Sequence, residues 1–159
     1  SVGVGIAIAN KMNKTPMRTY VLMGDGEQGE GSIYEAAMAG SHYKLDNLVA
    51  IIDRNYLQIS GNTEDVMSLD PMRERWEAFG WEVINAEGNN IDKLIDLFDS
   101  IDYSNGKPKL IISRTAKGNG ISYMENIAKW HHGVPNEEQY AQALKEIDER
   151  IAQFSSANN

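Results

Sequence analysis

Short apolar segments alternate with helical segments along the chain, and this alternation constrains the fold more than any other feature of the sequence. The apolar segments are predicted as strands at residues 18–23, 48–52, 81–86 and 109–113. The second segment is wholly apolar, which is typical of a parallel strand covered on both faces. Helices are predicted at residues 32–41, 70–80, 91–101 and 136–154. The alternation predicts an α/β fold, namely a doubly wound parallel sheet with helices on both faces.

Capping residues set the expected ends of these helices. Ser32 with Glu35 has the spacing of a capping box, in which two side chains satisfy backbone N–H groups of the first turn. Asn136 with Gln139 has the same spacing. Asp70 is predicted as the cap residue before a proline at the first helical position. In the third helix, the side chains that we expect to face inward are Leu94, Ile95, Leu97 and Phe98.

Length and composition limit both the number of domains and the classes of partner. A chain of 159 residues is long enough for one α/β domain with a sizeable core. The net charge of −8, with basic residues scattered singly, would repel nucleic acid and acidic membrane surfaces. The longest apolar stretches, such as residues 48–52, are too short to span a membrane, so no membrane or export segment is expected. The absence of cysteine fits a reducing compartment such as the cytoplasm.

The chain opens with Ser1, directly before a run of small residues at positions 2–9. Each glycine inside a helix costs about 1 kcal/mol relative to alanine. Such a run is therefore typically kept for close packing against another backbone. We expect a closely packed segment here, and we expect part of the domain to precede Ser1.

The loop after the first predicted strand fits two kinds of phosphate site. Its sequence, GDGEQG at residues 24–29, satisfies the G-x-G-x-x-G pattern of dinucleotide-binding folds, with Asp53 as a candidate ribose ligand. However, Asp25, Glu27 and Glu30 place three carboxylates in the loop. Like charges about 4 Å apart cost on the order of several kcal/mol at partly buried sites. A bare dinucleotide such as NAD should therefore be repelled.

A divalent cation between this loop and a diphosphate would remove the conflict. Mg²⁺ and Ca²⁺ bind carboxylate and diphosphate oxygens, and Mg²⁺ requires a near-octahedral set of ligands. Asp25 would supply one ligand. The ends of neighbouring parallel strands lie about 4.8 Å apart on one edge of a sheet. The Asn55 amide oxygen and a main-chain carbonyl two residues further on are therefore expected to reach the same ion.

The spacing of Gly24-Asp25-Gly26 and Asn55, with 28 residues between them, resembles the signature of thiamine diphosphate enzymes. Within those enzymes the chain resembles transketolases over nearly its whole length, and especially the N-terminal subunits of split transketolases. The segments that carry this resemblance are residues 27–37, 44–48, 57–61, 76–83, 115–120 and 130–135.

The resemblance implies a metal site and a diphosphate site in the predicted loops. Asp25, Asn55 and the carbonyl of Leu57 would bind Mg²⁺ or Ca²⁺, and Gly26 would let the backbone approach the diphosphate of thiamine diphosphate. Glu30 resembles a glutamate that joins an acidic network across the dimer interface of the family. The remaining residues of the implied cofactor-binding loop are Gly24 and Glu27.

Two adjacent histidines are candidates for a catalytic histidine. The family has one in the loop before the last helix, close to the cofactor diphosphate and the incoming sugar. His131 matches because it follows Trp130, and His132 matches because it precedes Gly133. A neutral imidazole can donate a hydrogen bond to a phosphate or to a substrate oxygen. The resemblance leaves the choice between them open.

The resemblance also implies a function. Residues 1–159 would form a single diphosphate- and metal-binding domain of a transketolase, without its N-terminal part and without the pyrimidine domain. Such enzymes transfer a two-carbon ketol unit between sugar phosphates of the pentose phosphate pathway as homo- or hetero-oligomers. We therefore expect a partner that carries the pyrimidine domain and no activity of the chain alone. Two alternatives stay open: another thiamine diphosphate enzyme, such as a deoxyxylulose-phosphate synthase, and an inactive fragment or interaction module.

Overall fold

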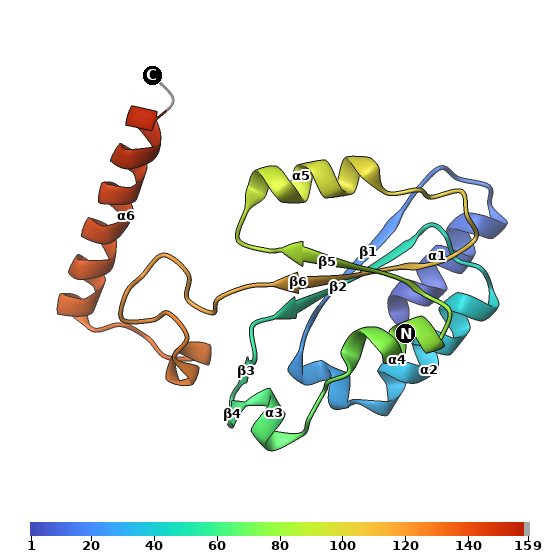
Figure 1. Ribbon diagram of the computed structural model, residues 1–159, viewed down its shortest axis with the longest axis horizontal. Coiled ribbons are helices and arrows are strands. Elements are labelled where there is room, and N and C mark those ends of the chain that lie inside the picture. The colour runs from blue at the N-terminus through green and yellow to red at the C-terminus, as the bar shows by residue number, and fades with distance from the viewer. Residues whose placement is uncertain (158–159) are drawn as a thin grey trace.

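A four-stranded parallel sheet forms the centre of the protein in the computed structural model, which describes residues 1–157 (Figure 1). The strands lie in the order β1-β2-β6-β5, and each pair of neighbours is parallel. Their bounds are Thr19–Gly24 (β1), Leu48–Arg54 (β2), Lys109–Arg114 (β6) and Glu82–Glu87 (β5). All four predicted strands are confirmed, each within two residues of its expected ends.

Helices cover both faces of this sheet (Figure 1). The helices on one face are α1 (Val2–Met12), α2 (Gly31–His42) and α4 (Met72–Ala78), and the helix on the other face is α5 (Ile91–Ser100). The larger apolar core lies on the first face and includes Leu48 and Trp76. The smaller core lies beneath α5 and includes Val49 and Ile111. The predicted doubly wound α/β fold is therefore confirmed.

Trp81 shows how closely α2 approaches the sheet. Its indole Nε1 donates a 2.8 Å hydrogen bond to the carbonyl of Ala37, and its ring lies 4.8 Å from that of Trp76 in a T-shaped pair. A Cβ added at Gly40 would lie 2.8 Å from the Trp81 ring. Because the interior is close-packed, only glycine at this position leaves room for the indole.

Shorter elements connect the main ones. A 3-10 turn, η1, follows β1, and a small antiparallel hairpin with a single helical turn follows β2. A second 3-10 turn, η2, lies in the loop between β6 and the last helix. The bounds of these elements are Gly26–Gly29 (η1), Leu57–Gln58 (β3), Gly61–Asn62 (β4), Thr63–Val66 (α3), Ala128–His131 (η2) and Glu137–Ala157 (α6).

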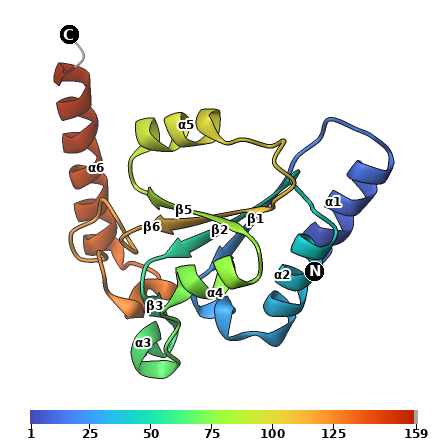
Figure 2. The ribbon, with the colours of Figure 1, turned by 45° about the vertical axis from the view of Figure 1, so that its right-hand side comes forward.

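The last helix, α6, stands apart from the sheet beside the loop that precedes it (Figures 1 and 2). The backbone N–H of Ser122 donates a 2.7 Å hydrogen bond to the carboxylate of Glu146, and the Tyr123 hydroxyl donates one of 2.8 Å to the carbonyl of Gln139. Asn136 and Gln139 exchange hydrogen bonds of 2.9 and 3.0 Å, so the capping box predicted here is confirmed. Within residues 1–157, neither α6 nor any shorter helix has the length and apolarity to cross a membrane.

The predicted start of α2 is wrong. The helix begins at Gly31 with Glu30 as its N-cap, and no side chain makes a capping hydrogen bond there. The reason is that η1 leads through a single extended residue, Glu30, into the helix. Ser32 therefore already lies inside the helix and does not pair with Glu35 as a capping box.

The predicted start of α4 and one predicted inward residue of α5 are also wrong. The N-cap position of α4 is Pro71 rather than Asp70, although Oδ1 of Asp70 accepts a 3.4 Å hydrogen bond from the backbone N–H of Met72 and its Oδ2 pairs with Arg54. On α5, Leu97 packs against the smaller core as expected, but Ile95 is 54% exposed. Since α5 lies mainly against β5 at the edge of the sheet, only a narrow side of the helix is covered.

Candidate cofactor and metal site

The carboxyl ends of β1 and β2 border a cleft of about 520 Å³. Gly24 and Asp53 are register partners at these ends, so the loops after the two strands start from neighbouring positions. The cleft is lined by the residues that were predicted to bind the cofactor, namely Gly24, Asp25, Gly26, Glu27, Glu30, Asn55 and Leu57. The cleft is also lined by Asp53, Gln58, Ile59, Ser60, Lys117 and His131. All seven residues predicted to contact the cofactor therefore share one cavity.

Asp25 lines this cleft and is only 1% exposed. Its Oδ2 accepts a 2.7 Å hydrogen bond from the backbone N–H of Tyr56 and a longer one, 3.4 Å, from Nη1 of Arg54. No hydrogen bond to Oδ1 comes from the part of the chain that the structure describes. One oxygen of a buried carboxylate is thus fixed by two donors, and the other remains available to a cation.

Asn55 is oriented by the residues on either side of it. Its Oδ1 accepts a 2.9 Å hydrogen bond from the backbone N–H of Leu57, and its Nδ2 donates one of 3.1 Å to Oδ2 of Asp53. An amide oxygen has two lone pairs, so Oδ1 can still bind a cation. The contacts hold the amide in one orientation at the edge where Leu57 also lines the cleft.

The Asp53 carboxylate is occupied at both oxygens. Oδ1 accepts a short hydrogen bond from the Thr115 hydroxyl, and Oδ2 accepts the bond from Asn55. These contacts orient the carboxylate between Asn55 and Thr115, and each oxygen keeps a lone pair for a further donor. They tie the end of β2 to the loop after β6 and do not by themselves exclude a ribose.

The glycine-rich loop satisfies one of its own backbone donors with a carboxylate. Oε2 of Glu27 accepts a 2.5 Å hydrogen bond from the backbone N–H of Gly24. Dinucleotide loops keep such N–H groups for the pyrophosphate. At this point the loop presents a carboxylate in place of a free N–H, and a cation between the loop and a diphosphate would offset the repulsion.

Gly26 provides a backbone surface inside the cleft. A Cβ added at this position would lie 3.2 Å from Oε1 and 3.3 Å from Cβ of Gln58. Both residues line the cleft, so a side chain here would narrow it. The glycine therefore keeps this part of the loop open to a bulky anion such as a diphosphate.

The donor set in this cleft fits a hard cation that also binds phosphate oxygens. No cluster of three or more His, Cys, Asp or Glu side chains suited to a metal ion occurs among residues 1–157. Asp25 supplies one carboxylate, and Asn55 and Leu57 offer neutral oxygens. Mg²⁺ is typically bound by one or two carboxylates and completed by substrate phosphates or water rather than by a full protein cage. The residues present therefore fit an ion shared with a diphosphate.

A buried cation, Arg54, contacts this site and was not predicted. Its guanidinium forms ion pairs with three carboxylates, at 3.4 Å to Asp25, 2.7 Å to Glu64 and 3.2 Å to Asp70. It also stacks on the Tyr56 ring with 3.8 Å between Cζ and the centroid. The sequence contained one signal for this role, an arginine that ends a strand with an apolar run at residues 48–52 and directly precedes a predicted ligand.

These ion pairs change the protonation equilibria of their members. Burial alone would raise the pKa of Glu64, but hydrogen bonds from Arg54, Ser68 and backbone N–H groups lower it to about 2. Burial would lower the pKa of Arg54, but the contacts with Glu64, Asp70 and Asp25 raise it. Both partners are therefore fully ionised at neutral pH.

His131, but not His132, lines the cleft. The two rings are 6.4 Å apart and nearly perpendicular to each other. Trp130 holds the preceding turn in place, because its Nε1 donates a 2.8 Å hydrogen bond to the carbonyl of Tyr123. Of the two histidines that matched the family, the structure brings only His131 to the other predicted residues.

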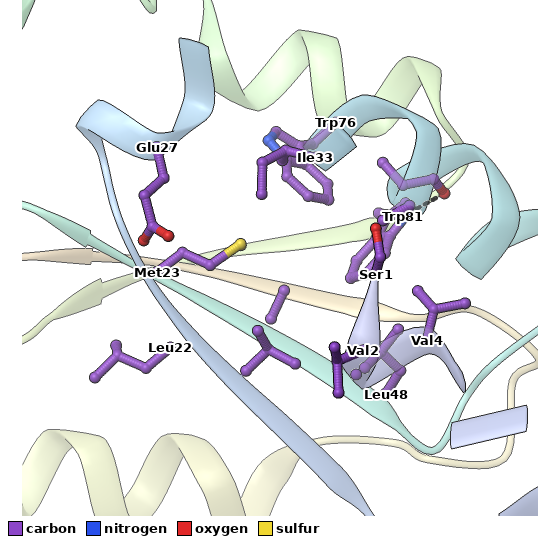
Figure 3. Close-up of a pocket in the computed structure, with 15 residues that line it drawn as sticks. Ser1, Val2, Val4, Leu22, Met23, Glu27, Ile33, Leu48, Trp76 and Trp81 are labelled. Carbon is purple, nitrogen blue, oxygen red and sulfur yellow. Dashed lines mark hydrogen bonds between the residues drawn. The ribbon is translucent and has the colours of Figure 1, made fainter. Parts of the chain in front are cut away.

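A second cavity, of about 250 Å³, lies on the other side of Glu27, between α1, α2 and β1 (Figure 3). Its walls are mainly apolar and include Met23, Ile33, Leu48 and Trp76. Glu27 lines both cavities. A diphosphate would find few polar partners in this apolar cavity, so it is not a candidate diphosphate site.

Comparison with known proteins gives one consistent result. The sequence profile of the family described as "Transketolase, thiamine diphosphate binding domain" matches residues 5–149. A protein of Phocaeicola vulgatus, named as one subunit of an apulose-4-phosphate transketolase, is 66% identical over 100% of this chain and 57% of its own length. A protein of the same name from Actinobacillus succinogenes is 48% identical over 92% of this chain and 52% of its own length.

A solved structure shares the fold. The transketolase of Campylobacter jejuni is 30% identical, with a TM-score of 0.82 over 91% of this chain and 24% of that chain. The chain thus spans little more than half the length of the curated relatives described above, and about a quarter of this solved structure.

Proposed function

The chain belongs to the transketolase family, whose thiamine diphosphate binding domain matches most of its length, and on this premise we propose that the cleft at the ends of β1 and β2 binds Mg²⁺ and the diphosphate of that cofactor. One observation carries the proposal: the buried Asp25 carboxylate is fixed at one oxygen and unbonded at the other within the described residues, in the cleft that Asn55 also lines. Asp25, Asn55 and the carbonyl of Leu57 would hold the metal ion.

The other lining residues would orient the cofactor and the substrate. Gly26 would lie against the diphosphate, and Lys117 would add a positive charge to an otherwise acidic lining. His131 would donate a hydrogen bond to a phosphate or to a substrate oxygen. Thiamine diphosphate, when bound, supplies the carbanion chemistry by which a two-carbon ketol unit moves between sugar phosphates.

The activity of the whole enzyme would require a second domain. We propose that residues 1–159 act as one diphosphate-binding domain and that a partner subunit supplies the pyrimidine domain, in line with the names of the two relatives, which describe them as subunits of a transketolase. Glu30 would lie near that partner. The name of the relative with 66% identity makes apulose 4-phosphate the first ketose phosphate to test, before xylulose 5-phosphate of the pentose phosphate pathway.

Calorimetry tests the binding proposal directly. Titration of thiamine diphosphate in the presence of Mg²⁺ should give a saturable heat that is absent when NAD replaces the cofactor. Asp25→Asn should weaken this binding at least about tenfold, because it removes the charged metal ligand. Asp96→Asn, a change of the same type on the exposed side of α5, should have no effect.

Two results would contradict the binding proposal. Absence of heat with the cofactor would leave the chain as an interaction module, and heat with NAD would restore the dinucleotide interpretation. For the activity, the chain alone should turn over no ketose phosphate, whereas addition of a partner with the pyrimidine domain should produce turnover. Turnover by the chain alone would show that the proposed division between two subunits is wrong.

A further inference from the structure

We infer that Arg54 is a positioning residue for the metal site: it fixes the Asp25 carboxylate so that Oδ1 faces the ion. This inference rests on the proposed function, because it concerns the same metal ion. Arg54 does not line the cleft that holds Asp25 and Asn55. Arg54 is therefore not itself a ligand of the ion, and its hydrogen bond to Asp25 is its link to the predicted ligand set.

The guanidinium of Arg54 is held from several directions at once. Nη1 donates to the hydroxyl of Thr63 at 2.9 Å and to Oδ2 of Asp25 at 3.4 Å. Nη2 donates to Glu64 at 2.7 Å and to Asp70 at 3.2 Å. Four partners on three segments thus fix the planar group. Its position relative to Asp25 is set by the whole segment from residue 63 to residue 70.

Arg54 also couples the two side chains that would bind the ion. It precedes Asn55, and Tyr56 follows Asn55; Arg54 and Tyr56 both donate hydrogen bonds to Oδ2 of Asp25. The Arg54 guanidinium stacks on the Tyr56 ring, which holds both donors together. A displacement of Arg54 would therefore rotate the Asp25 carboxylate relative to Asn55.

The charges around Arg54 indicate that it acts through geometry. A lone guanidinium near Asp25 would repel a divalent cation and weaken its binding. Here three carboxylates, of Asp25, Glu64 and Asp70, pair with one guanidinium, so the local charge remains negative. Arg54 therefore does not prevent cation binding, and its contribution is the orientation of Oδ1.

A geometric role predicts different effects on two metal ions. Mg²⁺ demands a near-octahedral arrangement, whereas Ca²⁺ accepts irregular sets of oxygen ligands. Loss of residues that orient metal ligands typically costs about 10- to 100-fold in metal affinity. Loss of Arg54 should therefore weaken Mg²⁺ binding about tenfold and Ca²⁺ binding less than about threefold.

The test measures the dissociation constants of Mg²⁺ and Ca²⁺ by calorimetry at saturating thiamine diphosphate, for the unmodified chain and four variants. Arg54→Gln should show the tenfold loss for Mg²⁺. Arg114→Gln is the matched control, since Arg114 is the register partner of Arg54 on β6 and lies 5.8 Å from the centroid of the same Tyr56 ring, but forms no ion pair among the described residues, and the variant should bind both ions normally. Thr63→Val removes one acceptor of Arg54 without a change of charge, and should weaken Mg²⁺ alone by about threefold.

The possible outcomes separate the alternatives. Tighter binding of both ions by Arg54→Gln would show a purely electrostatic role and overturn the inference, and so would unchanged Mg²⁺ affinity in a folded variant. If circular dichroism shows Arg54→Gln to be unfolded, Thr63→Val decides, and normal Mg²⁺ affinity there would also overturn it. Asp25→Asn distinguishes failure of the proposed metal site from failure of the role given to Arg54. If Asp25→Asn binds Mg²⁺ normally, the proposed function itself fails. If Asp25→Asn loses Mg²⁺ affinity and Arg54→Gln does not, only the role of Arg54 is refuted.

Discussion

The backbone N–H of Tyr56 donates a 2.7 Å hydrogen bond to Oδ2 of Asp25, which joins the loops that follow β1 and β2. Tyr56 makes this bond from a left-handed conformation, with φ of 64°. Such a conformation is uncommon for a residue with a side chain and costs of order 1–3 kcal/mol, so surrounding contacts must maintain it. Because Asn55 directly precedes Tyr56, this bond also fixes the distance between the two predicted side-chain ligands.

Two asparagines in the same segment allow the role of Asn55 to be separated from its local structural role. Oδ1 of Asn55 accepts from the N–H of Leu57, and Oδ1 of Asn62 accepts from that of Glu64, both at 2.9 Å. Asn55→Ala and Asn62→Ala should each lower the free energy of unfolding by about 1 kcal/mol. Only Asn55→Ala should weaken Mg²⁺ binding, at least about tenfold. Equal Mg²⁺ affinities of the two variants by calorimetry would remove Asn55 from the ligand set.

The position of His131 predicts selective protection by the cofactor. His42, His131 and His132 are all exposed, so diethyl pyrocarbonate should modify all three in the free chain. Thiamine diphosphate with Mg²⁺ should slow the modification of His131 severalfold, because this residue lines the cleft. His132 and His42 serve as internal controls and should react as before. Tandem mass spectrometry resolves the adjacent sites, and protection of His132 in place of His131 would reverse the assignment.

Much of the architecture and the grouping of the site residues could be predicted from sequence. The apolar run of β2 and its place between helices indicated the type of sheet, and parallel strands bring their carboxyl ends to one edge. Asp25 and Asn55 therefore had to lie near each other once β1 and β2 were neighbours. The capping box at Asn136 could also be predicted, because its two partners are only three residues apart and the spacing alone identifies it.

Features that depend on distant parts of the chain could not be predicted in this way. The contacts of Arg54 with Glu64 and Asp70 depend on how the segment after β2 folds back, which no local pattern encodes. The same fold-back gives Asp70 a second role that the capping pattern did not indicate, because its Oδ2 pairs with Arg54 while its Oδ1 accepts from the N–H of Met72. Ser32 and Glu35 had the spacing of a capping box, but the preceding turn shifted the start of the helix.

Two glycines of α1 test whether the small-residue run is kept for close packing. A Cβ at Gly3 would fall against Cγ2 of Val21, a stiff side chain packed against the core, whereas a Cβ at Gly5 would meet nothing within 4 Å. Gly3→Ala should lower the free energy of unfolding by about 1–3 kcal/mol. Gly5→Ala should raise it by about 0.5–1 kcal/mol, because alanine favours the helix. Denaturant unfolding measures both, and equal effects of the two changes would contradict the packing of α1 on β1.

The low pKa of Glu64 predicts a specific acid sensitivity. Burial raises this pKa, but the hydrogen bonds from Arg54 and Ser68 lower it from 4.5 to about 2 in the folded chain. The unfolded chain therefore binds the proton more tightly, and the contribution of Glu64 to stability is present above about pH 4.5 and lost as the pH falls towards about 2. Glu64→Gln should lower the free energy of unfolding by about 2 kcal/mol near neutral pH, because it removes charge-assisted hydrogen bonds to Arg54. The difference in the free energy of unfolding between Glu64→Gln and the unmodified chain should shrink on acidification through this range. Glu125→Gln, at an exposed loop position, is the control and should leave the free energy of unfolding unchanged at each pH. If urea unfolding gives the same difference for Glu64→Gln at all pH values, folding does not favour the ionised form of Glu64.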